Sequence, residues 1–233
     1  MALKRDLGFV LKISDFAESD LIITLLTERW GKRSAIVKRA RRYNSRLGGV
    51  FDILNHVEIV FYEKPGLDLV SQGALLHGFP RLKSDLAPVS TALATLKLLE
   101  RLLPWQQQEG RIYKLFQHFL HLLEKGEVPL PQLRLSVTLK MLSMLGHRPH
   151  LHSCMKCGRV ENPFLFNAEY GGVRCQSCAQ GEGIRISCGL ARTLDSLLNL
   201  PLERAGVVQL TEGDGKLAEG LISDYADFVI NGP

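Results

Sequence analysis

The fold of the first third of the chain is decided by the run Leu21-Ile22-Ile23-Thr24-Leu25-Leu26-Thr27. Its β-branched and apolar composition favours a strand. Comparable runs cover residues 7–13, 34–40, 50–62 and 67–76, and Gly- or Pro-containing turn signals separate them. Five short strands without a helix-length pattern between them predict a small closed barrel of the OB-fold type over residues 1–79. Barrels of this type often bind oligonucleotides.

Beyond residue 79, apolar residues recur at helical spacing. The predicted helices cover residues 85–103, 111–124, 130–145, 189–199 and 216–230. The third is apolar almost all round, which is typical of a helix at the centre of a bundle. We therefore predict an α+β protein in which the barrel precedes an α-helical domain, residues 80–233, with a cysteine-bearing insert at about residues 150–183.

Four of the five cysteines form two C-x2-C pairs: Cys154, Cys157, Cys175 and Cys178. Each pair offers two thiolates to one cation, and this spacing predicts one structural Zn²⁺ per chain. Four thiolates leave no position for a catalytic water. An iron–sulfur cluster remains the alternative, whereas disulfides do not suit a protein that nothing routes out of the reducing cytosol. Cys188 lies outside the pattern and is expected to be a small buried apolar side chain.

The net charge is +5, and the positive charge is concentrated in the first two thirds of the chain. Seven cations and no carboxylate lie between residues 32 and 46: Lys32, Arg33, Lys38, Arg39, Arg41, Arg42 and Arg46. Such a run on a strand and its following loop can track a phosphodiester backbone, and Trp30 and Tyr43 could stack on bases. The alternative is a solvated strand edge whose charges discourage aggregation.

Motifs for catalysis are absent from the sequence. It contains no phosphate-binding loop, no dinucleotide-binding turn and no H-E-x-x-H motif, and His56 and His77 have no evident nucleophile partner. We therefore expect a protein that is not an enzyme. A charge precedes any apolar run at the N-terminus, and the longest apolar stretches are about six residues, so we expect a cytoplasmic protein without a membrane span.

Several segments together resemble the RecO family of bacterial recombination mediators. They are Glu18–Thr27 followed by Gly31, the basic Lys38-Arg39-Ala40-Arg41 with Ser45-Arg46, and Leu145-Gly146 ahead of the paired cysteines, between which lie Phe164 and Gly171-Gly172. The resemblance implies a DNA repair protein whose OB-fold binds single- and double-stranded DNA and anneals complementary strands. One departure is Arg39, where the family often has glycine.

The resemblance also implies partners. Family members work with RecR, some contact the C-terminal tail of single-stranded-DNA-binding protein, and together they help RecA to load, in the bacterial cytoplasm at the nucleoid.

A second hypothesis is a protein-interaction scaffold whose helical domain binds acidic peptide tails, with DNA contact incidental. It is based on cations that lie among many Leu and Phe residues: Arg101, Arg111, Lys114, Arg134 and Lys140.

Overall fold

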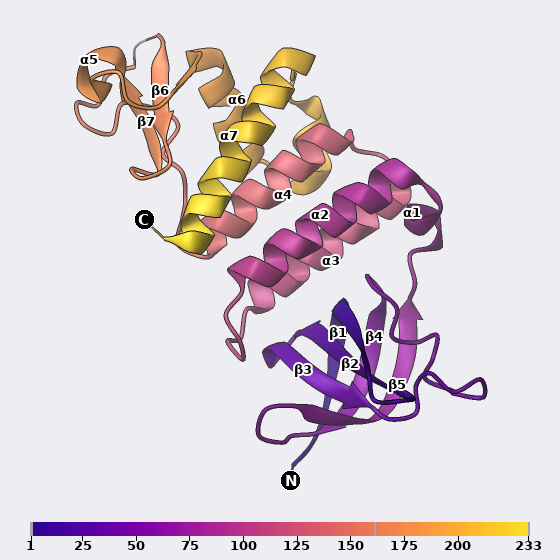
Figure 1. Ribbon diagram of the computed structural model, residues 1–233. Helices are drawn as coiled ribbons and strands as arrows, with labels where there is room; N and C mark the ends of the chain where they lie inside the picture. Colours follow the sequence, from indigo (N-terminus) through magenta and orange to yellow (C-terminus); the bar gives the residue numbers. More distant parts are fainter. Residues whose placement is uncertain (1, 161, 233) are drawn as a thin grey trace. The chain divides into compact units, whose positions relative to one another are not determined.

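A computed structural model describes residues 2–160 and 162–232 (Figure 1). The chain divides into two compact units, Met1–Glu124 (unit 1) and Lys125–Pro233 (unit 2). We expected the first domain to end at residue 79. The chain changes from strands to helices there, but the first three helices belong to the same compact unit as the barrel.

Unit 1 begins with the five-stranded barrel that the sequence predicts, and the prediction is confirmed. Its strands are β1 (Leu3–Phe16), β2 (Asp20–Thr27), β3 (Gly31–Val37), β4 (His56–Tyr62) and β5 (Asp68–His77). They close in the order β1-β2-β3-β5-β4, and every pairing is antiparallel except the short parallel contact between β3 and β5. Alternate side chains such as Ile23, Leu25 and Phe61 fill the interior.

Aromatic packing joins the barrel to the third helix of unit 1. Phe9 on β1 is fully buried, stacks on His56 with ring centroids 4.5 Å apart, and meets Phe116 edge to face. His56 Nε2 lies 2.7 Å from the Tyr113 hydroxyl, and both side chains are buried. These contacts explain why the outward face of β1 is apolar, and they give His56 a structural role.

Two predicted strands extend at one end beyond the strands that the structure forms. The predicted strand 50–62 begins only at His56, because Leu54 has a left-handed backbone (φ 70°) and the Asn55 side chain donates to the Val50 carbonyl. The predicted strand 34–40 ends at Val37, since Arg39 also adopts positive φ (55°). Backbone in this region cannot continue a sheet ladder.

The helices follow the predicted periodicity closely. Unit 1 has α1 (Pro80–Ser84), α2 (Leu86–Leu102) and α3 (Gly110–Lys125), and unit 2 has α4 (Leu130–Met144), α6 (Cys188–Asn199), the 3-10 helix η1 (Leu202–Val207) and α7 (Glu212–Asn231). α7 starts earlier than predicted because Thr211 caps it, accepting from the Asp214 backbone N–H. Among residues 2–160 and 162–232, none of the helices combines the length and apolarity of a membrane span.

The cysteine-bearing insert of unit 2 is a small three-stranded sheet with one short helix. Its elements are β6 (Phe164–Asn167), β7 (Gly172–Cys175), α5 (Gln176–Ala179) and β8 (Ile184–Ile186), with strand order β7-β6-β8. α4 lies at the centre of the unit, as predicted, because its Ser136 hydroxyl donates to the Leu197 carbonyl of α6 and it also contacts η1 and α7.

Candidate metal centre and nucleic-acid interface

The four paired cysteines converge in unit 2. The Sγ atoms of Cys154, Cys157, Cys175 and Cys178 all lie within 4.8 Å of one another. The first pair sits on a tight turn in which the Gly158 N–H donates to the Cys154 carbonyl, with Gly158 at positive φ (73°). The second pair spans the end of β7 and the start of α5. The two pairs are 21 positions apart in the sequence, and the fold brings them together as one set of four sulfur donors, as expected from the spacing.

Without a metal, these thiols differ in how readily they ionise. Burial opposes ionisation of Cys154, yet hydrogen bonds from the backbone at Cys175, Cys157 and Lys156 lower its pKa to about 6. Hydrogen bonds with Cys175 and Cys157 raise the pKa of Cys178 to about 12. Four thiolates this close repel one another, so all four can ionise together only around a positive ion. The donor set therefore suits a soft divalent metal.

Cys188 differs from its prediction. It is the first residue of α6 and is half-buried rather than buried, and its backbone N–H donates to Asn162 Oδ1.

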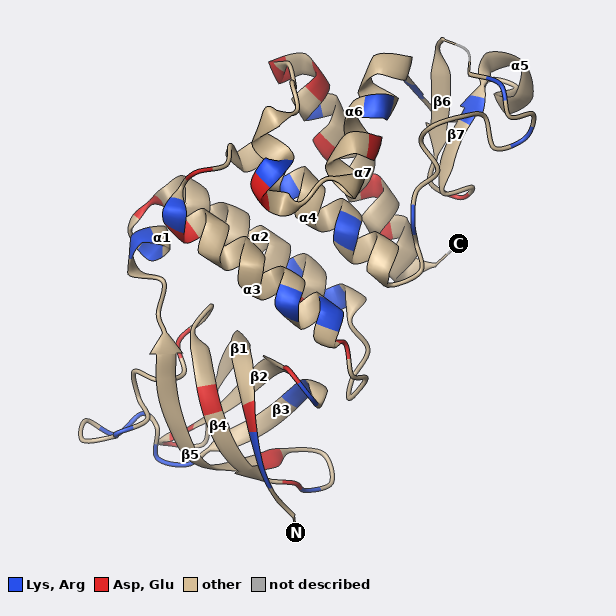
Figure 2. Cartoon of the chain, turned by 180° about the vertical axis from the view of Figure 1, so that it is seen from behind, with Lys and Arg blue, Asp and Glu red and all other residues tan. Residues whose placement is uncertain are grey.

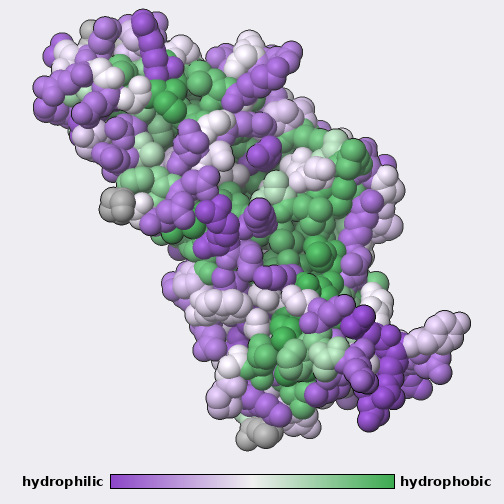
Figure 3. Space-filling view, in the orientation of Figure 1, coloured by the Kyte–Doolittle hydropathy of each residue, from purple (hydrophilic) through white to green (hydrophobic). Residues whose placement is uncertain are grey.

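The loop after β3 carries most of the predicted DNA-binding residues. We call the loop surface the exposed set Lys38, Arg39, Arg41, Arg42, Tyr43 and Arg46. Figure 2 shows blue residues along this loop, and Figure 3 shows it as a hydrophilic lobe projecting from the barrel. Ala40, which is 2% exposed, and Phe51, which is 1% exposed, anchor the loop in the barrel core. The loop that carries these cations is therefore attached to the barrel core at Ala40 and Phe51.

Asp20, which the sequence analysis missed, fixes the start of the loop. Its carboxylate accepts from the Arg39 backbone N–H (2.7 Å) and from Lys38 Nζ (2.8 Å). These two hydrogen bonds lower the pKa of Asp20. The left-handed backbone at Arg39 explains why a glycine would suit this position, and an arginine there costs roughly 1–2 kcal/mol.

The cations of the loop surface differ in their partners. Lys38 pairs with Asp20, and Arg41 Nη1 lies 3.2 Å from Asp15. The side chains of Arg39, Arg42 and Arg46 have no ion-pair partner among residues 2–160 and 162–232. Tyr43 is fully exposed.

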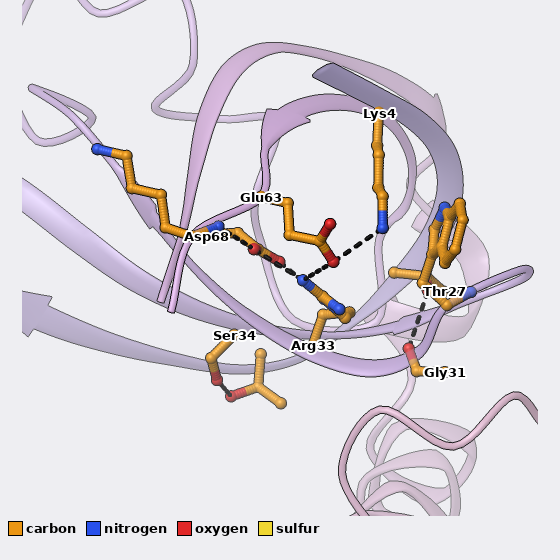
Figure 4. A network of polar contacts seen from close by, with 10 residues as sticks. Lys4, Thr27, Gly31, Arg33, Ser34, Glu63 and Asp68 are labelled. Carbon is orange, nitrogen blue, oxygen red and sulfur yellow. Dashed lines mark hydrogen bonds and ion pairs between the residues drawn. The ribbon is translucent and has the colours of Figure 1, made fainter. Parts of the chain in front are cut away.

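Arg33 is not placed for a phosphate contact, and we withdraw it from the predicted DNA-binding set. Its Nε and Nη2 atoms each donate to an Asp68 oxygen at 2.8 Å (Figure 4). Nη2 also donates to Glu63 Oε1, the same oxygen that Lys4 Nζ contacts. The hydrogen bond with Asp68 raises the pKa of Arg33 despite its burial. The side chain is 8% exposed.

Lys32 also leaves the predicted DNA-binding set, because its side chain is buried and already has a hydrogen-bond partner. It is 5% exposed, its Nζ donates to the Glu100 carbonyl at 2.7 Å, and it lies over the Trp105 ring. Trp30 remains 37% exposed, but Lys4 Nζ lies 3.6 Å from the centre of its ring and occupies one face. Only the other face of Trp30 can meet a base.

The cations of the scaffold hypothesis divide between the two units. Arg101, Arg111 and Lys114 belong to unit 1. In unit 2, Arg134 pairs with Glu219, and Lys140 Nζ donates to the Leu198 carbonyl, so both are used inside that unit.

Known protein families match the barrel and the helical part of this chain separately. Residues 1–79 match the family model described as Recombination protein O N terminal, and residues 83–233 match Recombination protein O C terminal. The chain belongs to the RecO family. The resemblance stated from the sequence segments is thereby confirmed.

Curated RecO relatives match along nearly the whole chain. The DNA repair protein RecO of Symbiobacterium thermophilum is 35% identical over 225 residues, which are 94% of this chain and 87% of the relative. The DNA repair protein RecO of Roseiflexus sp. is 28% identical over 230 residues (97% and 81%), and that of Oceanobacillus iheyensis is 27% identical over 223 residues (94% and 86%).

Proposed function

We propose that this protein is a non-catalytic DNA-binding and strand-annealing mediator of recombinational repair that holds DNA on its loop surface. The observation that carries the proposal is the set Arg39, Arg42 and Arg46, three exposed guanidinium groups without ion-pair partners among the described residues, on a loop anchored in an OB-like barrel. Annealing breaks no covalent bond. It requires cations that offset the repulsion between two backbones and contacts weak enough for strands to find their register.

Each part of the loop surface has a distinct task in this proposal. The three unpaired arginines bind phosphates and release counterions. Arg41 exchanges its exposed partner Asp15 for a phosphate at little cost, because exposed ion pairs are worth about 0–1 kcal/mol. Lys38, whose side chain is 60% exposed, meets a phosphate while it keeps its pair with the buried Asp20. Tyr43 stacks on an unpaired base. If about five cations bind phosphates, the logarithm of the single-strand binding constant should fall with the logarithm of salt with a slope of roughly −3.5.

We propose Zn²⁺ as the metal of the four-cysteine centre. Its role is structural, since four thiolates complete a tetrahedral sphere. Strands of four, four and three residues bury few side chains, and a metal supplies the cohesion that such a small core lacks.

The proposed partners follow from family membership. In this proposal the protein acts with RecR and with the C-terminal tail of single-stranded-DNA-binding protein, helps RecA to load onto the coated strand, and works in the bacterial cytoplasm at the nucleoid.

The test is fluorescence-monitored annealing of complementary oligonucleotides without nucleotide, together with a salt titration of single-strand binding. The variant R39A/R42A/R46A should weaken binding at least tenfold and reduce the salt slope by about two, at 0.7 per lost phosphate contact. The control R185A/R192A/R204A removes three exposed arginines from unit 2, so it has the same net charge and should bind like the wild type. Equal affinity and slope for the loop variant and the wild type would refute the proposal.

A further inference from the structure

A polar loop of unit 1, residues 104–109, is fixed against the start of β3. The Gln106 N–H donates to the Lys32 carbonyl at 3.0 Å, and Lys32 Nζ lies 4.5 Å from the centre of the Trp105 ring. Gly31 permits this approach, because a Cβ atom there would lie 1.9 Å from the Gln107 carbonyl oxygen. Trp105 nevertheless remains 55% exposed. Contacts with the buried Lys32 and the close approach at Gly31 therefore hold the Trp105 indole at the surface.

Beside this loop, the chain forms an open hollow of about 720 Å³. Its lining is Glu28, Arg29, Gln108, Glu109, Gly110, Arg111 and Lys114. The Arg29 side chain is 69% exposed, although its Nε lies 4.0 Å from the buried Asp6 carboxylate. Arg111 and Lys114 are exposed with no ion-pair partner in the described parts of the chain. Figure 2 shows blue residues at the ends of α2 and α3 next to the loop that joins them. We call Trp105 with these three cations the Trp105 surface.

The chemistry of the Trp105 surface matches a single-stranded nucleic acid. An exposed indole stacks on a base of any sequence, and guanidinium and ammonium groups contact the backbone. The exposed amides of Gln106 and Gln108 can donate to or accept from base edges, and the carboxylate of Glu28 can accept from them. A purely acidic peptide would meet Glu28 and Glu109 without an equivalent gain from the indole, so the surface favours a strand.

This surface is separate from the loop surface. The loop surface follows Val37 at one end of β3, and the Trp105 surface lies at Gly31, the other end. At about 3.3 Å per residue the two ends are about 20 Å apart. Between them lies the uncharged pair Thr24 on β2 and Ser34 on β3, whose hydroxyls are 3.2 Å apart. Each surface therefore meets a different stretch of nucleic acid.

We propose that the Trp105 surface is a second contact for single-stranded DNA, so that unit 1 holds two strands at once, one at each end of β3. The inference rests on the proposed function, in which the loop surface holds the first strand. When one molecule holds both strands, each strand searches for its complement within that complex. The effective concentration of the other strand is then high. Lys32, which the sequence placed in a DNA-binding run, then acts as a positioning residue that holds Trp105.

Tryptophan fluorescence gives a direct test. The chain has two tryptophans, so the variant W30F leaves Trp105 as the only one. Oligo-dT should quench its emission, and the quenching should persist in W30F/R39A/R42A/R46A, where the loop surface is disabled. An acidic peptide that quenches Trp105 where oligo-dT does not would overturn the proposal and mark a peptide site.

Stoichiometry and annealing give the second test. In R29A/R111A/K114A, the first oligonucleotide should bind within about twofold of the wild-type affinity, while saturation should fall from two strands to one per protein and annealing should slow at least tenfold. W105A should slow annealing similarly, and W105F should restore most of the rate because it keeps an aromatic face. Circular dichroism checks that each variant is folded, and R185A/R192A/R204A controls for charge.

The two proposals fail differently. Unchanged stoichiometry and unchanged annealing in R29A/R111A/K114A would overturn the second contact and leave the loop surface intact. Loss of all single-strand binding in that variant would instead make the Trp105 surface the primary site, and the two-strand arrangement would be wrong.

Discussion

Replacing Arg33 by methionine separates its structural role from a role in DNA binding. The substitution removes both 2.8 Å hydrogen bonds to Asp68 and leaves that carboxylate 2% exposed inside the barrel wall with one weak backbone donor, the Lys64 N–H at 3.2 Å. Breaking a buried pair from one side costs about 3–5 kcal/mol, because the remaining charge is desolvated without compensation. With a urea m-value of about 2 kcal/mol per molar, the midpoint should fall by about 2 M.

The assay is urea unfolding followed by tryptophan emission, which reports on unit 1 because Trp30 and Trp105 both lie there. The double variant R33M/D68L should recover most of the loss, since an apolar pair of similar volume avoids burying a lone charge. Under folding conditions R33M should bind oligonucleotides like the wild type. A loss below about 1 kcal/mol together with weakened DNA binding would refute the structural role and return Arg33 to the interface.

Further predictions concern the loop, the buried histidine, the metal and the docked glycine. R39G should stabilise unit 1 by about 0.5–1 kcal/mol in urea unfolding by relieving the left-handed backbone, while weakening DNA binding through loss of a cation; a destabilised R39G would contradict this account. Burial, followed by the nearby His121 and His77, lowers the pKa of His56 to about 4. Because the unfolded chain takes up that proton near pH 6.5, stability should be complete above that pH and fall by about 1–2 kcal/mol, after allowance for solvent screening, as pH drops toward 4. His56→Gln should flatten this dependence, and an equal loss in that variant would exclude His56 as the cause. Chelation, or C154S, should release about one zinc per chain and expose the insert to protease while tryptophan emission of unit 1 stays unchanged; a metal-free protein with a protease-resistant insert would contradict the structural role. G31A should shift the Trp105 emission and slow annealing, because its Cβ displaces the docked loop; an unshifted spectrum would show that the loop tolerates the methyl group.

Much of the fold could be predicted because its signals are local. The β-branched run of β2, the apolar periodicity of the helices and the caps that end them act over a few residues. The errors arose where a single backbone conformation ended a strand, as at Leu54 and Arg39, since propensity alone does not show that a residue adopts positive φ. Trp105 carried no usable signal, because its exposure depends on how the loop docks against Lys32.

By itself the sequence determined the barrel, the helices and the four-cysteine set, because spacing along the chain already brings two thiolates together in each C-x2-C turn. Only the tertiary structure decided which cations face solvent. Lys32 and Arg33 are buried by partners 68 and 35 residues away, whereas Arg42 and Arg46 in the same basic run stay exposed. Charge is a property of a residue, but its availability to a ligand depends on which distant carboxylate or carbonyl the folded chain places beside it.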